Sequence, residues 1–163
     1  MAKPALTHVG RDGAPAMVDV SAKAVTSREA VARGHVTVSA AARRLVRAGG
    51  VKKGDPLHVA RVAGIMAAKR TADLIPLCHQ LALSNVEVTI APSRSGFTIR
   101  ARVRTMAQTG VEMEALVAVS TAALTIYDML KAVDRAMVIG EICLVEKRGG
   151  RSGVYRRHRR GAS

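Results

Sequence analysis

Asp128 and Lys131, at the end of an apolar segment, have the types and the spacing needed to transfer protons. Three residues apart on a helix, two side chains lie on the same face, and a solvated ion pair there contributes only about 0.2–0.5 kcal/mol. The residues from Ala115 to Ile126 include no charged side chain, so this pair is expected to be partly buried. A partly buried carboxylate and ammonium group can exchange protons with a substrate. We therefore interpret Asp128 and Lys131 as candidate catalytic residues.

Two lysines stand directly before the predicted start of a helix. Lys52 and Lys53 precede Gly54 and Asp55, and the exposed N–H groups of a helix start attract anions. A solvated loop accounts for Lys52, whereas Lys53 is a candidate functional residue.

Two further polar segments are candidate substrate contacts. Leu77-Cys78-His79 lies in a connection between a helix and a strand, where functional groups are common, although a lone histidine is more often structural. Glu112-Met113-Glu114 opens a long helix, where acidic residues also have a structural reason because they offset the helix dipole. At about 100° per residue, the two glutamates project to roughly opposite sides of that helix.

Periodicity and turn residues indicate the elements that must position these side chains. Asp55 is a good helix cap, and two alternating segments flank the turn Pro92–Gly96, which predicts an antiparallel hairpin. The predicted elements are a strand at His35–Ser39, a helix at Ala40–Ala48, a helix from Pro56 that ends before Pro76, strands at Asn85–Ala91 and Phe97–Val103, a helix at 111–133 and a strand at Met137–Val145.

The order β-α-β-β-α-β is typical of a split βαβ arrangement. We therefore predict an α+β, ferredoxin-like sandwich in which helices cover one face of an antiparallel sheet. The 163 residues suit one domain, expected at 18–154 between an irregular segment at 1–17 and a basic, disordered tail at 155–163. This fold hosts many unrelated functions, including RNA-binding modules, so it does not identify the activity.

The amino-acid composition indicates which kinds of partner and which cellular compartment to expect. A net charge of +14 indicates an anionic partner, while an aromatic content of 2% argues against single-stranded nucleic acid, whose bases stack on aromatic rings. No run approaches the roughly 18 apolar residues of a membrane span, and the first residues do not form a signal peptide. Cys78 and Cys143 are not closely spaced, which argues against a disulfide framework or a cysteine zinc site. We expect a cytoplasmic protein with no resident metal.

Read in order, these segments resemble the molybdenum cofactor biosynthesis protein C family, the cyclic pyranopterin monophosphate synthases. The resemblance covers roughly residues 5–154 and rests on the combination of motifs rather than on any one of them. The matching stretches are Met17–Lys23, Lys53–Asp55, Ala60–Ile65, Ala67–Thr71, Asp73–His79, Thr109–Leu116, Ala122–Met129, Lys131–Val133, Met137–Gly140 and Lys147–Gly153.

The resemblance implies conversion of (8S)-3′,8-cyclo-7,8-dihydroguanosine 5′-triphosphate into cyclic pyranopterin monophosphate and diphosphate. This rearrangement requires no redox cofactor, and magnesium can accompany the substrate phosphates. The resemblance also implies a homohexamer, a trimer of dimers with sites near the dimer interface, and no nucleic acid or membrane as partner.

Residue roles follow from the resemblance by position. The family's catalytic aspartate falls on Asp128, with Lys131 beside it and Lys53 as a further catalytic position. Gln80 and Ala72 differ from residues common in the family, and bear on local loop shape rather than on the chemistry. The implied substrate-binding residues are Leu77, Cys78, His79, Glu112, Met113, Glu114, Lys69, Lys147 and Arg28.

Two other classes of function compete with an enzyme: a basic RNA-binding module on the same sandwich, and an oligomer with a degenerate site. Against the RNA-binding module, Phe97 is the only aromatic residue in its predicted strand, where an RNA-recognition strand has about three. For the enzyme, Glu114 and Asp128 on one straight helix would be about 21 Å apart along its axis. That separation predicts a site shared between two subunits related by a two-fold axis.

Overall fold

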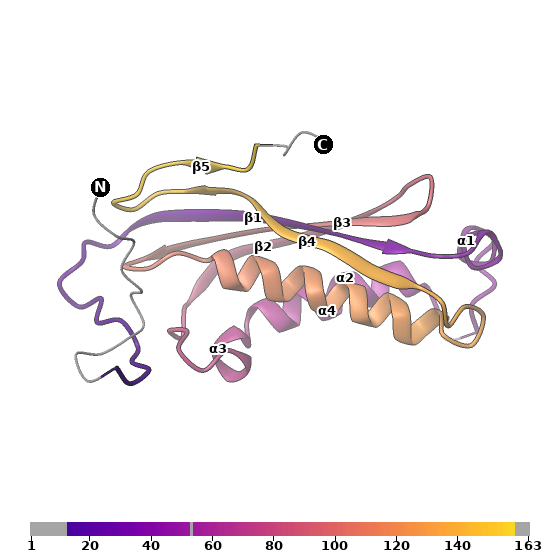
Figure 1. Cartoon of the computed structure of the whole chain (residues 1–163), viewed down its shortest axis with the longest axis horizontal. Coiled ribbons are helices and arrows are strands. Elements are labelled where there is room, and N and C mark those ends of the chain that lie inside the picture. The colour runs from indigo at the N-terminus through magenta and orange to yellow at the C-terminus, as the bar shows by residue number, and fades with distance from the viewer. Residues whose placement is uncertain (1–12, 53, 159–163) are drawn as a thin grey trace.

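A five-stranded antiparallel sheet with helices on one face forms the structure, a computed structural model that describes residues 13–52 and 54–158 (Figure 1). The strand order is β2-β3-β1-β4-β5, so each helical connection crosses over one strand. This order confirms the predicted split βαβ sandwich. The strands are β1 (Thr26–Thr37), β2 (Leu83–Pro92), β3 (Gly96–Ala107), β4 (Val138–Arg148) and β5 (Tyr155–Arg156).

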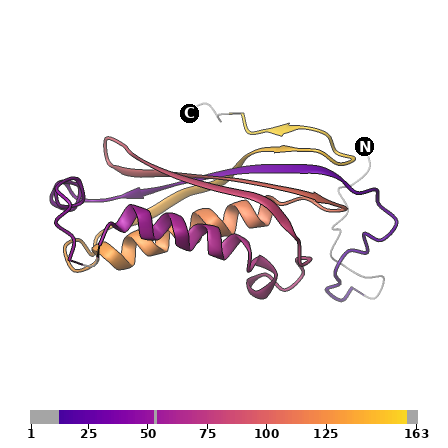
Figure 2. The same ribbon diagram turned by 180° about the vertical axis from the view of Figure 1, so that it is seen from behind.

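Two long helices lie antiparallel beneath the sheet, and two short ones extend the connection before β2 (Figure 2). The cap of the second helix is as predicted, because Asp55 Oδ1 accepts hydrogen bonds from the Leu57 and His58 N–H groups at 2.9 and 3.2 Å. The helices are α1 (Ala40–Arg47), α2 (Pro56–Ala68), α3 (Thr71–Leu74) and α4 (Glu112–Leu130).

Small side chains let the helices and the sheet approach closely. Ala118 and Ala122 of α4 are fully buried, as is Ala101 of β3. A side chain at Gly64 of α2 would place its Cβ 2.8 Å from the Ala118 carbonyl oxygen, so the crossing of α2 and α4 requires glycine there. By length and mean hydropathy α4 could cross a membrane, although Ser120 interrupts its apolar run. Half of its apolar window is buried inside this fold, as in a core helix.

Several element bounds differ from the predicted ones. Strand β1 begins nine residues before the predicted start at His35. The strand signal in the sequence is weak there, because Thr26–Glu29 are all polar and Ala30, Ala32 and Gly34 are small rather than β-branched or aromatic. Helix α2 ends at Ala68 and a separate turn of helix, α3, fills the space before Pro76. Helix α4 ends at Leu130, so Lys131 is its C-cap residue rather than an interior one.

The prediction of a disordered C-terminal tail is wrong for its first residues. Tyr155 and Arg156 form β5 and pair with Lys147 and Glu146 of β4, and the Arg157 N–H donates to the Val145 carbonyl at 2.8 Å. Gly149, Gly150 and Gly153 have positive φ, so the chain can reverse and add a strand at the sheet edge. The rest of the predicted tail, 159–163, and most of the predicted irregular segment, 1–12, lie outside the described residues.

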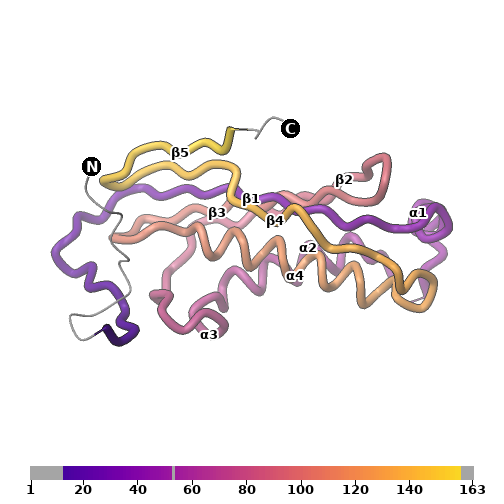
Figure 3. Tube along the Cα trace, in the orientation of Figure 1, coloured from indigo at the N-terminus to yellow at the C-terminus, as the bar shows by residue number. Residues whose placement is uncertain are grey.

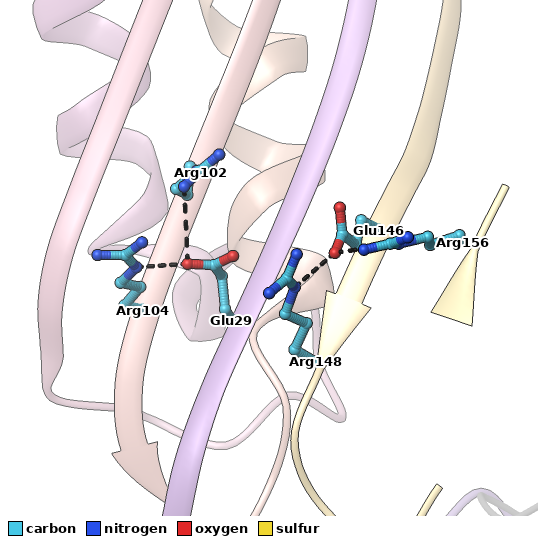
Figure 4. A network of polar contacts seen from close by, with 6 residues as sticks. All are labelled: Glu29, Arg102, Arg104, Glu146, Arg148 and Arg156. Carbon is cyan, nitrogen blue, oxygen red and sulfur yellow. Dashed lines mark hydrogen bonds and ion pairs between the residues drawn. The ribbon is translucent and has the colours of Figure 1, made fainter. Parts of the chain in front are cut away.

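The sheet face that carries no helix bears a network of ion pairs (Figure 4). Glu29 of β1 accepts a hydrogen bond from Arg104 and lies 3.9 Å from Arg102, while Glu146 pairs with Arg148 and, at 3.5 Å, with Arg156. Val31, opposite Arg102 and Glu146 in the register, is only 1% exposed. The long arginine side chains therefore account for burial of an apolar residue on an otherwise open face.

Candidate active site

Two adjoining cavities occupy one end of the molecule, the left end in Figure 1. Their volumes are about 410 and 1100 Å³, and Lys23, Thr109, Gly110 and Glu112 line both. The walls come from the segment before β1, the α3–β2 connection, the start of α4 and the turn between β4 and β5. Residues far apart in the sequence are thus brought to one double cavity.

The smaller cavity collects six of the predicted substrate-binding residues. Val18 closes its other side, and its carbonyl lies 2.9 Å from His79 Nε2, so that nitrogen is the N–H donor of the ring. In the tautomer that makes this hydrogen bond, Nδ1 is the acceptor of the ring. The six residues are Leu77, Cys78, His79, Glu112, Met113 and Glu114.

Burial dominates the electrostatics of the smaller cavity. Glu114 is 4% exposed, and its burial, with added repulsion from Glu112, raises its pKa to about 7. Burial and the nearby Glu114 charge also raise the pKa of Cys78. Cys78 therefore remains a thiol at neutral pH, which suits packing against a ligand better than nucleophilic attack.

The buried Glu114 carboxyl is expected to make the folded chain less stable as pH rises, and replacing Glu114 with glutamine should remove this effect. A carboxyl whose pKa is about 7 in the folded state and near 4.5 when unfolded binds more protons in the native state between those values. Stability therefore falls as pH rises from about 4.5 to about 7, by up to about 3 kcal/mol. Melting temperatures from pH 4.5 to 8 should decline less for Glu114→Gln than for the unmodified chain. Glu87→Gln, at an exposed carboxylate on β2, serves as the control and should track the unmodified chain. If melting temperature depended on pH in the same way for all three proteins, the raised pKa of Glu114 would be contradicted.

The larger cavity is cationic. Arg28 Nε and Nη2 each donate at 3.2 Å, to the Ala107 and Gln108 carbonyls, so the guanidinium group is held in place. Lys147 Nζ hydrogen-bonds Ser152 Oγ across the β4–β5 turn. Gly149 in that turn has φ 92°, and a side chain there would collide with the Ser27 carbonyl. The cations of the lining are Lys23, Arg28, Lys147, Arg148 and Arg151, against the carboxylates Glu29 and Glu112.

Three of those five cations were missed by the sequence prediction. Lys23 and Arg151 lie in segments that carry the family resemblance, Met17–Lys23 and Lys147–Gly153, but sequence position alone gave no reason to pair them. Arg148 ends β4, where it also pairs with Glu146.

The candidate proton-transfer pair lies at the opposite end of the molecule. Lys131 Nζ is 2.6 Å from Asp128 Oδ1, and their side chains are 54% and 60% exposed. The expected partial burial is therefore wrong within a single chain. The hydrogen bond from Lys131 to Asp128 raises the pKa of Lys131. Glu114 lies in the first turn of the same helix, fourteen residues before Asp128 and about 21 Å away along the helix axis.

Of the other predicted lysines, Lys69 lines neither cavity. Lys53 lies outside the described residues. The end of α1, the start of α2 and the end of α4 lie together on the right side of Figure 3. At this end, Asp134 Oδ2, after α4, accepts a hydrogen bond at 2.6 Å from the N–H group of Ser39, before α1. Lys69 is exposed just after α2.

No group of three or more His, Cys, Asp or Glu side chains within the described ranges could hold a metal ion. Glu29 and Glu112 are the acidic residues that line the larger cavity. Their carboxylates could contact a metal ion that accompanied an anionic ligand there. The expectation that no resident cofactor is required stays a prediction.

The chain is similar to curated proteins over nearly its whole length. It is 57% identical over 158 residues to a protein of Parvibaculum lavamentivorans, covering 96% of this chain and 99% of that protein. It is 60% identical to a protein of Chloroflexus aggregans and 59% to one of Thermomicrobium roseum, with 93% of each chain covered in both comparisons. All three relatives are named cyclic pyranopterin monophosphate synthase. A model of the MoaC family matches residues 17–150, and the chain belongs to that family.

Proposed function

We propose that this chain is a cyclic pyranopterin monophosphate synthase of molybdenum cofactor biosynthesis and acts in the cytoplasm. Its substrate is (8S)-3′,8-cyclo-7,8-dihydroguanosine 5′-triphosphate and its products are cyclic pyranopterin monophosphate and diphosphate, a phosphorus–oxygen lyase reaction. The observation that carries this proposal is the double cavity, which joins a pocket of carboxyl, imidazole and apolar groups to a cationic one.

The two cavities suit the two halves of such a substrate. We place the ring system in the smaller cavity, where Glu114 and His79 offer hydrogen-bonding groups and Met113 an apolar wall. The triphosphate occupies the larger cavity, among Arg28 and Lys147. When a substrate hydroxyl bonds to the α-phosphorus, it loses its proton and the bond from that phosphorus to the bridging oxygen breaks. Diphosphate leaves with the electron pair, and the released proton balances the charge of the departing group. The cations stabilise the charge that develops on the departing group.

Opening and reclosing the purine ring requires protons to move in both directions. A carboxylate takes up a proton and an ammonium group gives one, so Asp128 and Lys131 suit general base and general acid roles. Since they lie about 21 Å from Glu114 along α4, we propose that each site draws them from a second chain. The expected assembly is a homohexamer, a trimer of dimers.

The fold gives less support to an RNA-binding module. Phe97 is 3% exposed and belongs to the core beneath the sheet, so it cannot stack on a base from the open face.

The decisive experiment is turnover of the purified chain. Incubation with the 3′,8-cyclo nucleotide triphosphate should release one diphosphate per cyclic pyranopterin monophosphate formed, measured by a coupled diphosphate assay and by chromatography. Binding without diphosphate release would indicate a degenerate site and overturn the proposal.

Replacing Arg151 with alanine is expected to raise KM for the triphosphate substrate about 10- to 100-fold, since a hydrogen bond to a charged group contributes roughly 1.5–3 kcal/mol. Steady-state kinetics should show a smaller change in kcat than in KM. Arg100→Ala, at an exposed arginine on the open sheet face, is the matched control for lost positive charge. Equal effects of the two changes would mean that the larger cavity does not bind the phosphates.

Mixing two inactive variants is expected to restore activity. With His79→Ala and Asp128→Ala chains, a site formed by two chains is intact only when each chain supplies its unmodified residue. Random exchange makes that about one site in four. Activity should therefore rise from near zero to about a quarter of that of the unmodified enzyme. If mass spectrometry verifies exchange and activity remains at zero, both residues act from the same chain.

A further inference from the structure

Three glycines of the turn between β4 and β5 share a left-handed backbone conformation. Gly149, Gly150 and Gly153 have φ values of 92, 72 and 63°. The turn lies beside the start of β1, where Glu29 pairs with Arg148, at the left end of Figure 1. Glycine adopts positive φ without the steric cost that other residues incur, so backbone conformation alone accounts for glycine at all three positions.

The surroundings of the three glycines differ. A Cβ at Gly149 would collide with backbone, the Ser27 carbonyl oxygen. A Cβ at Gly153 would meet no atom within 4 Å in the described part of the chain, apart from its own neighbours. A Cβ at Gly150 would collide with Arg28 Nη1 and lie 2.7 Å from Arg28 Cζ. Gly150 therefore has a second reason to be glycine, because its missing side chain leaves room for a charged group.

The guanidinium group of Arg28 is held in that room by the end of β3. Its Nε and Nη2 donate to the carbonyls of Ala107 and Gln108, each at 3.2 Å. Arginine has five N–H groups, so these two bonds do not use the two on Nη1. Both acceptors are neutral carbonyls, so the bonds fix the group without cancelling its positive charge. Arg28 thus extends from the end of β3 to the β4–β5 turn, with Nη1 in the space that a side chain at Gly150 would fill.

This placement bears on anion binding in the larger cavity, which both Arg28 and Gly150 line. A guanidinium group binds a phosphate through N–H groups of fixed direction, so its affinity depends on where the group is held as well as on its charge. A methyl group at Gly150 would displace the flexible end of Arg28 rather than backbone. The displaced guanidinium group would lose its fixed position against the Ala107 and Gln108 carbonyls.

We infer that Gly150 is a positioning residue for phosphate binding, and that it acts through Arg28. The absence of a side chain at Gly150 lets the guanidinium group lie against the β4–β5 turn and present Nη1 to a phosphate. The inference rests on the proposed function for the identity of that phosphate as part of the substrate. It adds to that function a role for Gly150 that the conformation of the turn does not require.

The affinity for inorganic triphosphate tests this role without any need for turnover. Gly150→Ala should weaken binding, measured by isothermal titration calorimetry, by about tenfold, because the displaced arginine loses a hydrogen bond to a charged group. In the turnover assay, KM should rise by a similar factor, with a smaller change in kcat.

Gly153→Ala is the matched control for Gly150→Ala. It imposes the same left-handed strain, but its methyl group would not touch Arg28. This variant should bind triphosphate as the unmodified chain does, and both variants should have similar melting temperatures. Equal losses of affinity for the two variants, or no loss for Gly150→Ala, would overturn the inference.

A double-variant cycle separates displacement of Arg28 from damage to the turn. Arg28→Ala removes the group for which Gly150 leaves room, so adding Gly150→Ala to it should weaken triphosphate binding no further. A damaged turn would lower the affinity in either background, so additive losses contradict the role of Gly150 even if Gly150→Ala alone binds poorly.

The same measurements distinguish this inference from the proposed function. A chain that shows the expected pattern with inorganic triphosphate but does not turn over the cyclic nucleotide loses the function and keeps the role of Gly150. A chain that turns over, and in which Gly150→Ala behaves like Gly153→Ala, loses only the role of Gly150. An unmodified chain without affinity for inorganic triphosphate loses both.

Discussion

Replacing Asp128 with asparagine should reduce kcat by at least about a hundredfold and leave the fold intact. General acid–base groups contribute typically 10²–10⁴-fold, and an amide of nearly the same shape cannot take up the proton that a carboxylate does. The folding cost should be small, because Asp128 is 60% exposed and exposed ion pairs contribute about 0–1 kcal/mol. Diphosphate release gives kcat and thermal melting gives stability. Activity within a few-fold of the unmodified enzyme would remove Asp128 from the mechanism.

The chain offers a close control for this change. Asp73 is also an exposed carboxylate in an i,i+3 ion pair, 3.4 Å from Arg70, and it does not line the double cavity. Asp73→Asn should match Asp128→Asn in melting temperature while retaining turnover. A comparable loss of turnover for both would indicate an effect of surface charge rather than of proton transfer.

Lys131→Ala should likewise stop turnover, and Lys131→Arg should restore little of it. Arginine keeps the positive charge but hardly deprotonates, so the pair of variants separates electrostatic from proton-transfer roles. Asp128 raises the pKa of Lys131 through their hydrogen bond, which couples the two side chains. Since coupled residues are not additive, the double variant Asp128→Asn, Lys131→Ala should lose little more than either single one.

An arginine variant with nearly full kcat would contradict this role for Lys131. Lys131 would then be a clamp for the substrate phosphates. Measuring diphosphate as a product inhibitor distinguishes the two outcomes, because a clamp variant changes the inhibition constant and a proton-transfer variant does not.

Local sequence signals were sufficient for much of the fold. Asp55 followed by Pro56 located the start of α2, and the alternation around Pro92–Gly96 gave the β2–β3 hairpin, since both depend on neighbouring residues alone. The first half of β1 was missed because its partners, β3 and β4, decide that it is a strand. The same holds for Tyr155 and Arg156, whose strand partner is β4.

Part of the lining of the double cavity was predictable as a set of residues, but its arrangement was not. Leu77–His79 and Glu112–Glu114 line the same cavity because the α3–β2 connection lies beside the start of α4. Neither segment's own sequence indicates this tertiary contact. Lys23 and Arg151 join Arg28 for the same reason, from segments more than a hundred residues apart. The separation of Asp128 from Glu114 was predictable, because it depends only on the rise of a helix.

That separation along α4 has a consequence for genetics. With the proposed two-chain site, alleles altered at the cavity end, such as His79, and alleles altered at Asp128 or Lys131 would form two complementation groups within one gene, since each defective chain supplies the half that the other lacks. Two alleles from the same group would not complement. A cell that expresses one from each group should recover molybdenum enzyme activity, although neither allele supports it alone.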